Sequence, residues 1–429
     1  LWFTSIDKPD SLGPVSAEGA VWFKDNVTAG EASEPFLFAG WPRRCAWVMN
    51  GGNAGTELVF ETDVQGNGTW NNFYKLILPR GQGSYIEFGE DEPGEWIRVR
   101  SKSGTVVTVQ FNYSAQDNRG MVLPGIFDGL ADAENGNAVG GLLYGIGNNR
   151  RALGMVSYYS EAGSRTMNGY YELNDKLELI KKDDPATEKF ITEEFAVPAG
   201  VVSMENSSVL VIDDRGRRWR LPKGNEAYDE LTNSAGLRIC REVATERDLF
   251  NCHGTFYELP AENADGYARI RPIASHNFQV ADYASYRGML IMTGTDREYN
   301  GVNEHLIRSE DKKAAVWAGV IDDLWQLGRP TGRGGPWKDS EVRAGIPSDP
   351  YLIGFYNEKK LTLSHSSDGL VKFNIEADPS GAGQWFKYKE VVVTGGSVFT
   401  FAFPAHFQAR WIRFTANRDC IASAWLVYE

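Results

Sequence analysis

The side chains best suited to chemistry gather in the middle of this 429-residue chain. Six side chains of residues 253–287 form the candidate set: His253, Tyr257, Arg271, His276, Asp282 and Arg287. A neutral histidine or a tyrosine can remove the proton beside a carboxylate, and arginines can hold that carboxylate with paired hydrogen bonds. This set predicts a metal-independent polysaccharide lyase acting on a uronate-containing glycan. Alternatively, the same residues clamp the substrate of a hydrolase, or both histidines are strand-end residues bonded to backbone.

Acidic residues precede several expected strands, and they suggest hydrolysis instead. Glu34 stands before 35–38, Asp349 before 350–353 and Asp282 before 287–290, and Asp128 precedes 140–147 by a long loop. Glycoside hydrolysis needs two carboxylates, one to protonate the leaving oxygen and one to attack or to activate water. We therefore expect two of these four acids to be catalytic, with His253 as a further candidate. The alternative is that they are ordinary turn residues.

The elements that would position these residues are indicated by an internal repeat. Residues 1–114 align without gaps on residues 316–429, with about two dozen identities where chance gives about seven. The run ETDVQGNGTW (61–70) meets EADPSGAGQW (376–385), and Trp96-Ile97-Arg98 meets Trp411-Ile412-Arg413. The shared D-x-x-G-x-G could be a calcium loop, but its glycines favour a hairpin turn. Residues shared by both copies are expected to be scaffold.

Short alternating segments rich in β-branched and aromatic residues predict strands throughout the chain. In the second copy they are 351–356, 359–365, 371–377, 385–393, 398–403, 409–414 and 421–428. The middle, residues 115–315, continues in this style, and only 187–195 and 225–232 have helical composition.

Many short strands and a unit recurring at both ends favour one all-β domain, a β-propeller of about five to seven blades. Ring closure would place the first and last units side by side, with the acids around a central mouth. The alternative is a pair of related β-sandwich modules, 1–114 and 316–429, flanking a separate β domain. Most shared tryptophans are expected in the core, whereas Trp22 and Trp337 stand in polar or glycine-rich loops where an indole could stack on a sugar.

Composition limits the partners of the protein. The formal net charge of −13 argues against nucleic acid and anionic membrane surfaces, and no apolar run is long enough to span a bilayer. The four cysteines match no metal spacing, although Cys240 and Cys252 could form a disulfide or remain free buried thiols. No nucleotide, flavin or metalloprotease motif is visible, so we expect no cofactor. We expect a monomer with a carbohydrate substrate.

Three stretches carry a resemblance to a class of proteins: HGTFYELPAEN…RPIASHN, GGPWKDSEVRAGIPSDPYL (334–352) and QARWIRFTANRDCIASAWLVY. In style they resemble secreted, propeller-like carbohydrate-active proteins of polysaccharide-degrading bacteria. The resemblance implies a secreted or periplasmic location and carbohydrate chemistry, most simply glycoside hydrolysis, with lyase activity or non-catalytic glycan binding as alternatives. It transfers no residue roles.

Overall fold

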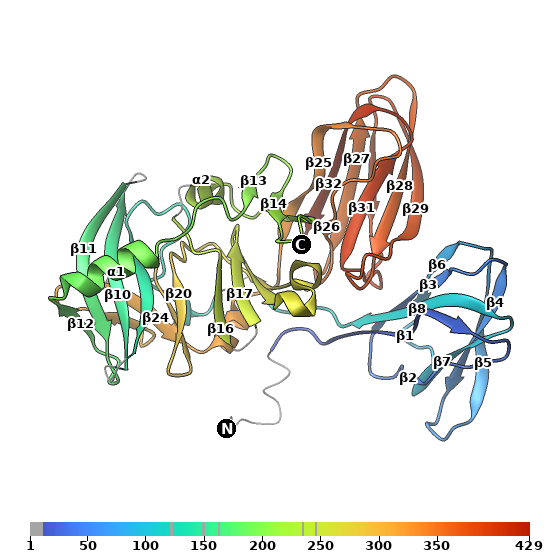
Figure 1. The fold of residues 1–429 in the computed structure, drawn as a ribbon, viewed down its shortest axis with the longest axis horizontal. Helices are drawn as coiled ribbons and strands as arrows, with labels where there is room; N and C mark the ends of the chain where they lie inside the picture. Colours follow the sequence, from blue (N-terminus) through green and yellow to red (C-terminus); the bar gives the residue numbers. More distant parts are fainter. Residues whose placement is uncertain (1–11, 121–122, 148–150, 162–163, 234–235, 245–246) are drawn as a thin grey trace. The chain divides into compact units, whose positions relative to one another are not determined.

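The computed structural model describes residues 12–120, 123–147, 151–161, 164–233, 236–244 and 247–429 (Figure 1). The protein is mostly β, which confirms the all-β prediction. The chain divides into two compact units. Among the described residues, unit 1 contains 12–13 and Arg119–Gly334, and unit 2 contains Pro14–Asn118 and Gly335–Glu429. The LWFTSID segment with Trp2 lies outside the described residues.

The first part of unit 2 is a sandwich of two four-stranded antiparallel sheets, ordered β1-β8-β3-β6 and β2-β7-β4-β5. Its strands are β1 (Ser16–Val27), β2 (Phe36–Leu37), β3 (Arg43–Asn50), β4 (Thr56–Asp63), β5 (Trp70–Leu78), β6 (Gly83–Phe88), β7 (Trp96–Ser101) and β8 (Thr105–Ser114). Successive strands mostly change sheet, so the chain winds around both layers. This eight-stranded, two-sheet order is a jelly roll.

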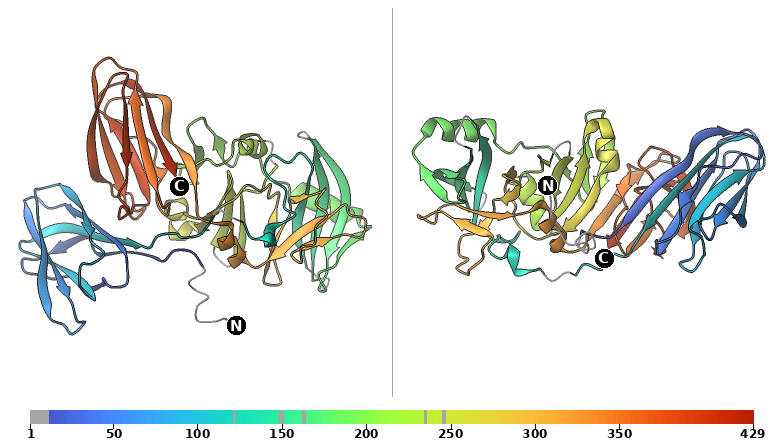
Figure 2. Two further views of the ribbon diagram at one scale, coloured as in Figure 1. Left: turned by 180° about the vertical axis from the view of Figure 1, so that it is seen from behind. Right: turned by 90° about the horizontal axis from the view of Figure 1, so that it is seen from below.

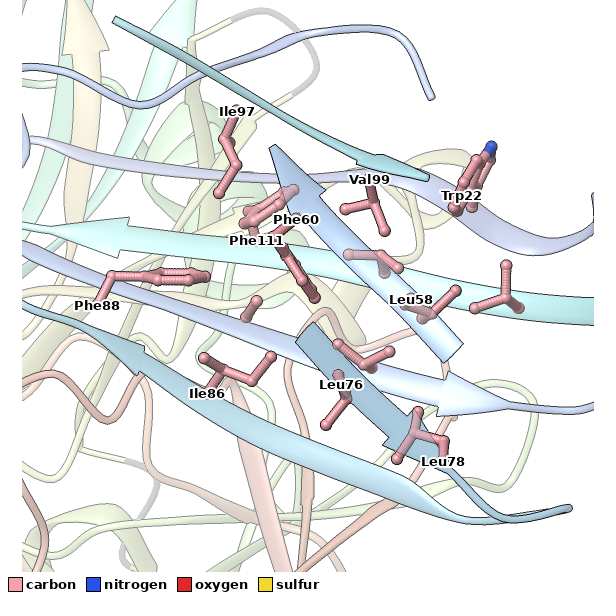
Figure 3. Close-up of a cluster of buried hydrophobic side chains, with 14 of the residues drawn as sticks. Trp22, Leu58, Phe60, Leu76, Leu78, Ile86, Phe88, Ile97, Val99 and Phe111 are labelled. Atoms are coloured by element: carbon pink, nitrogen blue, oxygen red, sulfur yellow. The ribbon is translucent and has the colours of Figure 1, made fainter. Parts of the chain in front are cut away.

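The apolar faces of the two sheets meet in an aromatic core (Figure 3). The Phe60 and Phe88 ring centroids are 6.2 Å apart, and Phe36 stacks on Phe111 at 5.1 Å. Trp22 belongs to the same core and is 6% exposed. Burial of this apolar surface is the main force that holds the sandwich together.

The last part of unit 2 repeats the jelly roll, with sheets ordered β25-β32-β27-β30 and β26-β31-β28-β29. Its strands are β25 (Gly332–Val342), β26 (Tyr351–Leu352), β27 (Lys359–His365), β28 (Leu370–Asp378), β29 (Phe386–Thr394), β30 (Val398–Ala402), β31 (Trp411–Ala416) and β32 (Cys420–Tyr428). Each strand of the second sandwich has a counterpart in the first, as β26, which starts at Tyr351, has in β2, which starts at Phe36. The offset in residue number between these two starts recurs, to within one residue, in every other pair of strands. The sequence repeat is therefore a repeat of structure.

The propeller prediction is wrong: the described strands form several separate antiparallel sheets and no propeller. A blade pairs strands in chain order, whereas β1 pairs with β8, and β3 pairs with both β6 and β8. The sequence pattern could not distinguish the two folds, because jelly rolls and propellers both need short alternating strands and frequent turns. Each repeat closes on itself as a sandwich, so no ring gathers the loops around one mouth.

The shared D-x-x-G-x-G segment is a turn in both sandwiches, as its glycines indicated. The Asp63 carboxylate accepts hydrogen bonds from the backbone N–H groups of Gln65, Asn67 and Gly68. Asp378 accepts them from Ser380, Gly381 and Gly383. These carboxylates are thus occupied by the backbone of their own loops.

Unit 1 holds two four-stranded sheets, ordered β16-β17-β18-β19 and β20-β21-β24-β23, and a five-stranded sheet ordered β12-β11-β10-β9-β22. Strands β13, β14 and β15 pair in that order. The bounds are β9 (Ala138–Ile146), β10 (Ala152–Glu161), β11 (Ser164–Leu173), β12 (Leu179–Lys182), β13 (Ser203–Met204), β14 (Val209–Ile212), β15 (Arg218–Leu221), β16 (Cys240–Ala244), β17 (Arg247–Cys252), β18 (Thr255–Pro260), β19 (Arg271–Ser275), β20 (Tyr283–Tyr286), β21 (Met289–Met292), β22 (Thr295–Asp296), β23 (Leu306–Arg308) and β24 (Ala315–Gly319).

Unit 1 also contains the helices. They are α1 (Pro185–Glu194) and α2 (Ala227–Asn233), with 3-10 turns η2 (Gly125–Phe127), η3 (Glu262–Ala264), η4 (Gly266–Arg269) and η5 (Ile321–Leu327). Both α-helices lie where the composition predicted them. Asp184 caps α1 by accepting the Thr187 N–H, and the helix lies across the five-stranded sheet (Figure 2). No helix of the described chain has the length and hydrophobicity needed to cross a membrane.

Lys359 is an unusual buried cation of the second sandwich. It is 4% exposed, and its ammonium donates one hydrogen bond, 3.5 Å long, to the Phe407 carbonyl. Its counterpart in the first sandwich, Arg44, donates to the carbonyls of Phe38, Gly89, Glu90 and Glu92. Burial, with a smaller effect of the charge on Arg43, lowers the pKa of Lys359 from 10.5 to about 7. Protonation therefore opposes folding.

Lys359→Met should stabilise unit 2 at pH 7 by roughly 1–4 kcal/mol, because a poorly paired buried cation is replaced by an apolar side chain of similar volume. Between pH 7 and 10.5 the unfolded chain binds more protons at this site than the folded chain, so wild-type stability should rise with pH in that window. The variant should lack this rise. Urea unfolding of both proteins at pH 7, 8.5 and 10 measures it, and parallel pH profiles would contradict the assignment.

Candidate functional site

Glu34 and Asp349 occupy the same position in the two sandwiches of unit 2. Each follows a serine, Ser33 or Ser348, whose hydroxyl accepts a backbone N–H from β7 or β31. The serine hydroxyl also donates to the carbonyl of the acid that follows it. The serine thus holds the strand entrance in both copies, and the acid contributes its backbone carbonyl to this contact.

Asp128 and Asp282 belong to unit 1 and have different surroundings. Asp128 is exposed at the end of η2, where its carbonyl accepts a hydrogen bond from Asn303. Asp282 is completely buried. The four predicted catalytic acids are therefore distributed between both sandwiches and unit 1, and the mouth that was expected to gather them does not exist.

Asp282 is the centre of a buried ionic network. Its carboxylate accepts hydrogen bonds from Arg238 at 2.9 and 3.1 Å and from Arg241 at 3.0 Å. Two backbone N–H groups, those of Leu143 and Tyr283, also donate to it at 2.9 and 2.8 Å. The arginines donate further to the carbonyls of Phe195 and Leu143. Asp282 therefore joins three sheets through β9, β16 and β20 and is closed to substrate.

His253 forms the tip of a hairpin. With Gly254 it makes the two-residue turn between β17 and β18, and both residues have positive φ, 51° and 77°. Nδ1 accepts the Gly224 N–H at 2.8 Å, so the ring proton lies on Nε2, which is 2.9 Å from Asp229. Burial lowers the pKa of His253, only partly opposed by Asp229. Both ring nitrogens are hydrogen-bonded, so this neutral imidazole connects Gly224 and Asp229 and is not available as a general base.

His276 and Tyr257 are also structural. Nδ1 of His276 accepts the Phe278 N–H and Nε2 donates to Asn251, while burial lowers its pKa to about 3. Tyr257 is fully buried against Phe250. These two residues were predicted to bind substrate, but Tyr257 is fully buried, and His276 is partly buried with both ring nitrogens hydrogen-bonded within the protein.

The remaining predicted substrate-binding residues belong to different elements of the two units. Arg287 forms the β20–β21 hairpin turn with Gly288, at φ 53° and 80°. Arg271 opens β19, with its guanidinium 5.9 Å from the Trp325 ring centroid. Trp22 and Trp337 are 6% and 8% exposed, so neither indole offers a face for a sugar.

The structure does bring His253 and His276 together, around Tyr228 of α2. Their ring centroids lie 5.6 and 6.2 Å from that of Tyr228, whose hydroxyl donates to the Phe278 carbonyl at 2.9 Å. Asp229, the next residue, accepts from Lys223 and contacts His253. The histidines thus fix one side of α2. Its other side faces a cavity.

This cavity of unit 1 has a volume of about 380 Å³. Its wall combines Ala227, Glu230 and Leu231 of α2, the loop 133–136, β9, Tyr158 and Arg165, and the segments 236–237 and 279–281. Cavities of a few hundred Å³ are typical of small-molecule sites. It is therefore the candidate site.

Tyr158 is the notable polar group of the wall. The residue is 2% exposed, and its hydroxyl has no hydrogen-bond partner among the described residues. The guanidinium of Arg165 lies 4.4 Å from its ring centroid. A Cβ on Gly140 would stand 2.4 Å from the ring, so glycine lets Tyr158 lie against β9. A buried, unsatisfied hydroxyl costs free energy unless a water or ligand bonds to it.

Gln279 shapes the opposite wall. Its Nε2 donates to the carbonyls of Asp132, Ala133 and Asn135, which fixes the loop that carries Glu134. Glu134 accepts a hydrogen bond from Asn225 at 3.0 Å, next to α2. Glu134 and Glu230 therefore bring two exposed carboxylates to the cavity.

Sequence reasoning missed all of these cavity residues. They come from four segments spread between Ala133 and Ala281, and none belongs to a motif. The available signal was local: Gly140-Gly141 inside a strand indicates close packing, and His-Gly and Arg-Gly between strand-like segments indicate two-residue hairpin turns.

No group of histidine, cysteine or acidic side chains in the described residues is arranged to hold a metal ion. All four cysteines are free thiols, and burial raises the pKa of Cys240 and of Cys252 to about 12. These thiols are therefore protonated and poorly reactive at neutral pH.

No protein-family model matches the sequence, and no curated protein matches it. Among solved structures, the PBSX exported protein XepA is 6% identical, with 96% of this chain and 86% of that chain covered, at a TM-score of 0.19. The SPBc2 prophage-derived protein YomS is 17% identical over 24% of this chain and 95% of its own, at 0.19. Lactobacillus farciminis oxalate decarboxylase is 8% identical over 98% and 78%, at 0.16. Such scores support no assignment.

Asp282→Asn should destabilise unit 1 by about 3–5 kcal/mol, because it leaves two partly buried arginines without the buried carboxylate that is their counter-charge. The matched control is Asp128→Asn, an exposed carboxylate of the same unit, which should change stability by less than about 0.5 kcal/mol. Urea unfolding followed by tryptophan fluorescence compares them. Equal stability of the two variants would exclude a structural role for the ionic network.

Tyr158→Phe should not lower the free energy of unfolding, since no protein hydrogen bond is lost, and it should raise that free energy by up to about 1–3 kcal/mol because a buried, unbonded hydroxyl is removed. Tyr283→Phe is the matched control, because the Tyr283 hydroxyl contacts the carbonyls of Ile239 at 3.1 Å and Leu249 at 2.7 Å. That variant should lose about 1–3 kcal/mol. Similar losses in both, measured by thermal unfolding, would mean that the Tyr158 hydroxyl is bonded within the protein.

Proposed function

We propose that unit 1 is a carbohydrate-binding module that holds part of an oligosaccharide in the 380 Å³ cavity. The observation that carries the proposal is that Tyr158 belongs to the wall of this cavity and has an enclosed hydroxyl with no partner in the described protein. A ligand hydroxyl can both donate to it and accept from it. Binding would thus satisfy a group that the fold leaves unsatisfied.

The rest of the wall supports a sugar over a purely apolar ligand. Small and apolar residues, among them Ala133, Ala138 and Leu237, can contact the C–H faces of a sugar ring. Glu134, Glu230 and Gln279 offer polar atoms for its hydroxyl groups. An apolar surface with a few placed polar groups is typical of small-molecule sites.

Glycoside hydrolysis in the same cavity is the second candidate. Two carboxylates, those of Glu134 and Glu230, line one cavity, and hydrolysis needs two. Binding is favoured because both carboxylates are exposed at the rim, whereas the enclosed polar atom is a tyrosine hydroxyl. An elimination reaction would instead use Tyr158 with Arg165.

The full chain should bind at least one member of a panel of neutral and charged oligosaccharides in calorimetric titration. Tyr158→Phe should weaken that binding about tenfold, the equivalent of one good hydrogen bond. Tyr144→Phe, a tyrosine of the same sheet outside the cavity, is the control and should bind as wild type.

The same incubations report on catalysis. New reducing ends that disappear in Glu134→Gln and Glu230→Gln would establish hydrolysis, and added absorbance of an unsaturated uronate would establish elimination. Binding without either product supports the binding module. A panel without any binding, or full affinity in Tyr158→Phe, would refute carbohydrate recognition at this cavity.

A further inference from the structure

We infer that the sugar bound in this cavity carries a free, positively charged amino group, as in a hexosamine that is not acetylated. The inference rests on the proposed carbohydrate binding and names the class of sugar. Two observations carry it: which polar atoms of the wall remain open to a ligand, and the balance of charge around them.

Hydrogen-bond acceptors dominate the open part of the wall. Both hydrogens of the Gln279 amide are directed at three loop carbonyls, so Oε1 is its remaining polar atom. The carboxylates of Glu134 and Glu230 accept only, and the Tyr158 hydroxyl can accept or donate. A ligand rich in donors fits such a wall, and an ammonium group supplies three.

Two donors belong to the wall as well. Asn135 accepts the Asn137 N–H with its Oδ1, which leaves its amide nitrogen as a neutral donor. The guanidinium of Arg165 lies on the face of the Tyr158 ring. These groups suit the hydroxyl oxygens of a sugar and require no anionic ligand.

The charge of the wall also favours a ligand with an ammonium group. Two glutamates and one arginine line the cavity, so the wall carries a formal net charge of −1, in a chain whose net charge is −13. A cationic amine can compensate the negative charge of the two glutamates through charge-assisted hydrogen bonds, which are about twice as strong as neutral ones. A uronate or sulfate would be repelled instead. Acetylation of the amine removes both the charge and two donors.

The test is calorimetric titration of the full chain at pH 6 and low ionic strength with four probes. They are a β-1,4-linked glucosamine tetramer, its fully N-acetylated form, a neutral glucose tetramer and spermidine, an amine that is not a sugar. Wild type is compared with Glu134→Gln, Glu230→Gln and Glu194→Gln. Glu194 is an exposed glutamate of α1 outside the cavity, so its variant controls for the loss of one charge.

We expect the glucosamine tetramer to bind about tenfold more tightly than either other sugar, and added salt to reduce this preference. Glu134→Gln and Glu230→Gln should each lower the preference, and Glu194→Gln should leave it unchanged. Raising the pH until the sugar amine is neutral should also abolish it.

Other outcomes separate the two claims. Equal binding of all three sugars would overturn the amino-sugar inference and leave the proposed function in place. Binding of spermidine as strong as that of the glucosamine tetramer would overturn the inference too, because the sugar would then contribute nothing. Absence of binding by all three sugars would refute the proposed function itself.

Discussion

The architecture of unit 1 depends on one buried carboxylate. Asp282 accepts hydrogen bonds from two arginines and two backbone N–H groups. These bonds connect the sheets that contain β9, β16 and β20. A buried ion pair contributes little net stability, but removal of one partner is costly. The network therefore fixes which sheets meet. Leu237 and Ala281, the residues just before Arg238 and Asp282, line the cavity, so its wall depends on this junction.

The central histidines also position a wall of the cavity. His253 and His276 hold Tyr228 and Asp229 on one side of α2, and the next residues of that short helix, Glu230 and Leu231, face the cavity. A seven-residue helix is not stable by itself, because helix nucleation is costly. Its geometry must come from such tertiary contacts. The residues that seemed suited to chemistry are positioning residues for a wall made by their neighbours.

Local structure could be predicted from the sequence because it depends on local patterns. Strand β27 was predicted at its observed bounds, and helix α1 within two residues, from alternation and composition. The fold could not be predicted, since the choice between blade and jelly roll depends on which strands pair, and β1 with β8 is a pairing across the whole repeat. The surroundings of the candidate catalytic residues could not be predicted for a similar reason. A histidine in a hairpin turn and an aspartate between two arginines have side chains typical of catalysis, and only tertiary contacts show them to be occupied.

The duplication explains why a distinctive site is expected in unit 1 and not in the sandwiches. Polar residues that both sandwiches share serve the backbone or one another: Asp63 and Asp378 close loops, Ser33 and Ser348 fasten strands, and Glu61 and Glu376 pair with Arg98 and Arg413. Two positions with the same contacts have the same task, which is to maintain the jelly roll. The Tyr158 hydroxyl has the opposite character, because the described protein gives it no partner. The wall of the cavity contains one enclosed hydroxyl that the described protein leaves unbonded, and the partner of that hydroxyl is best sought in the ligand.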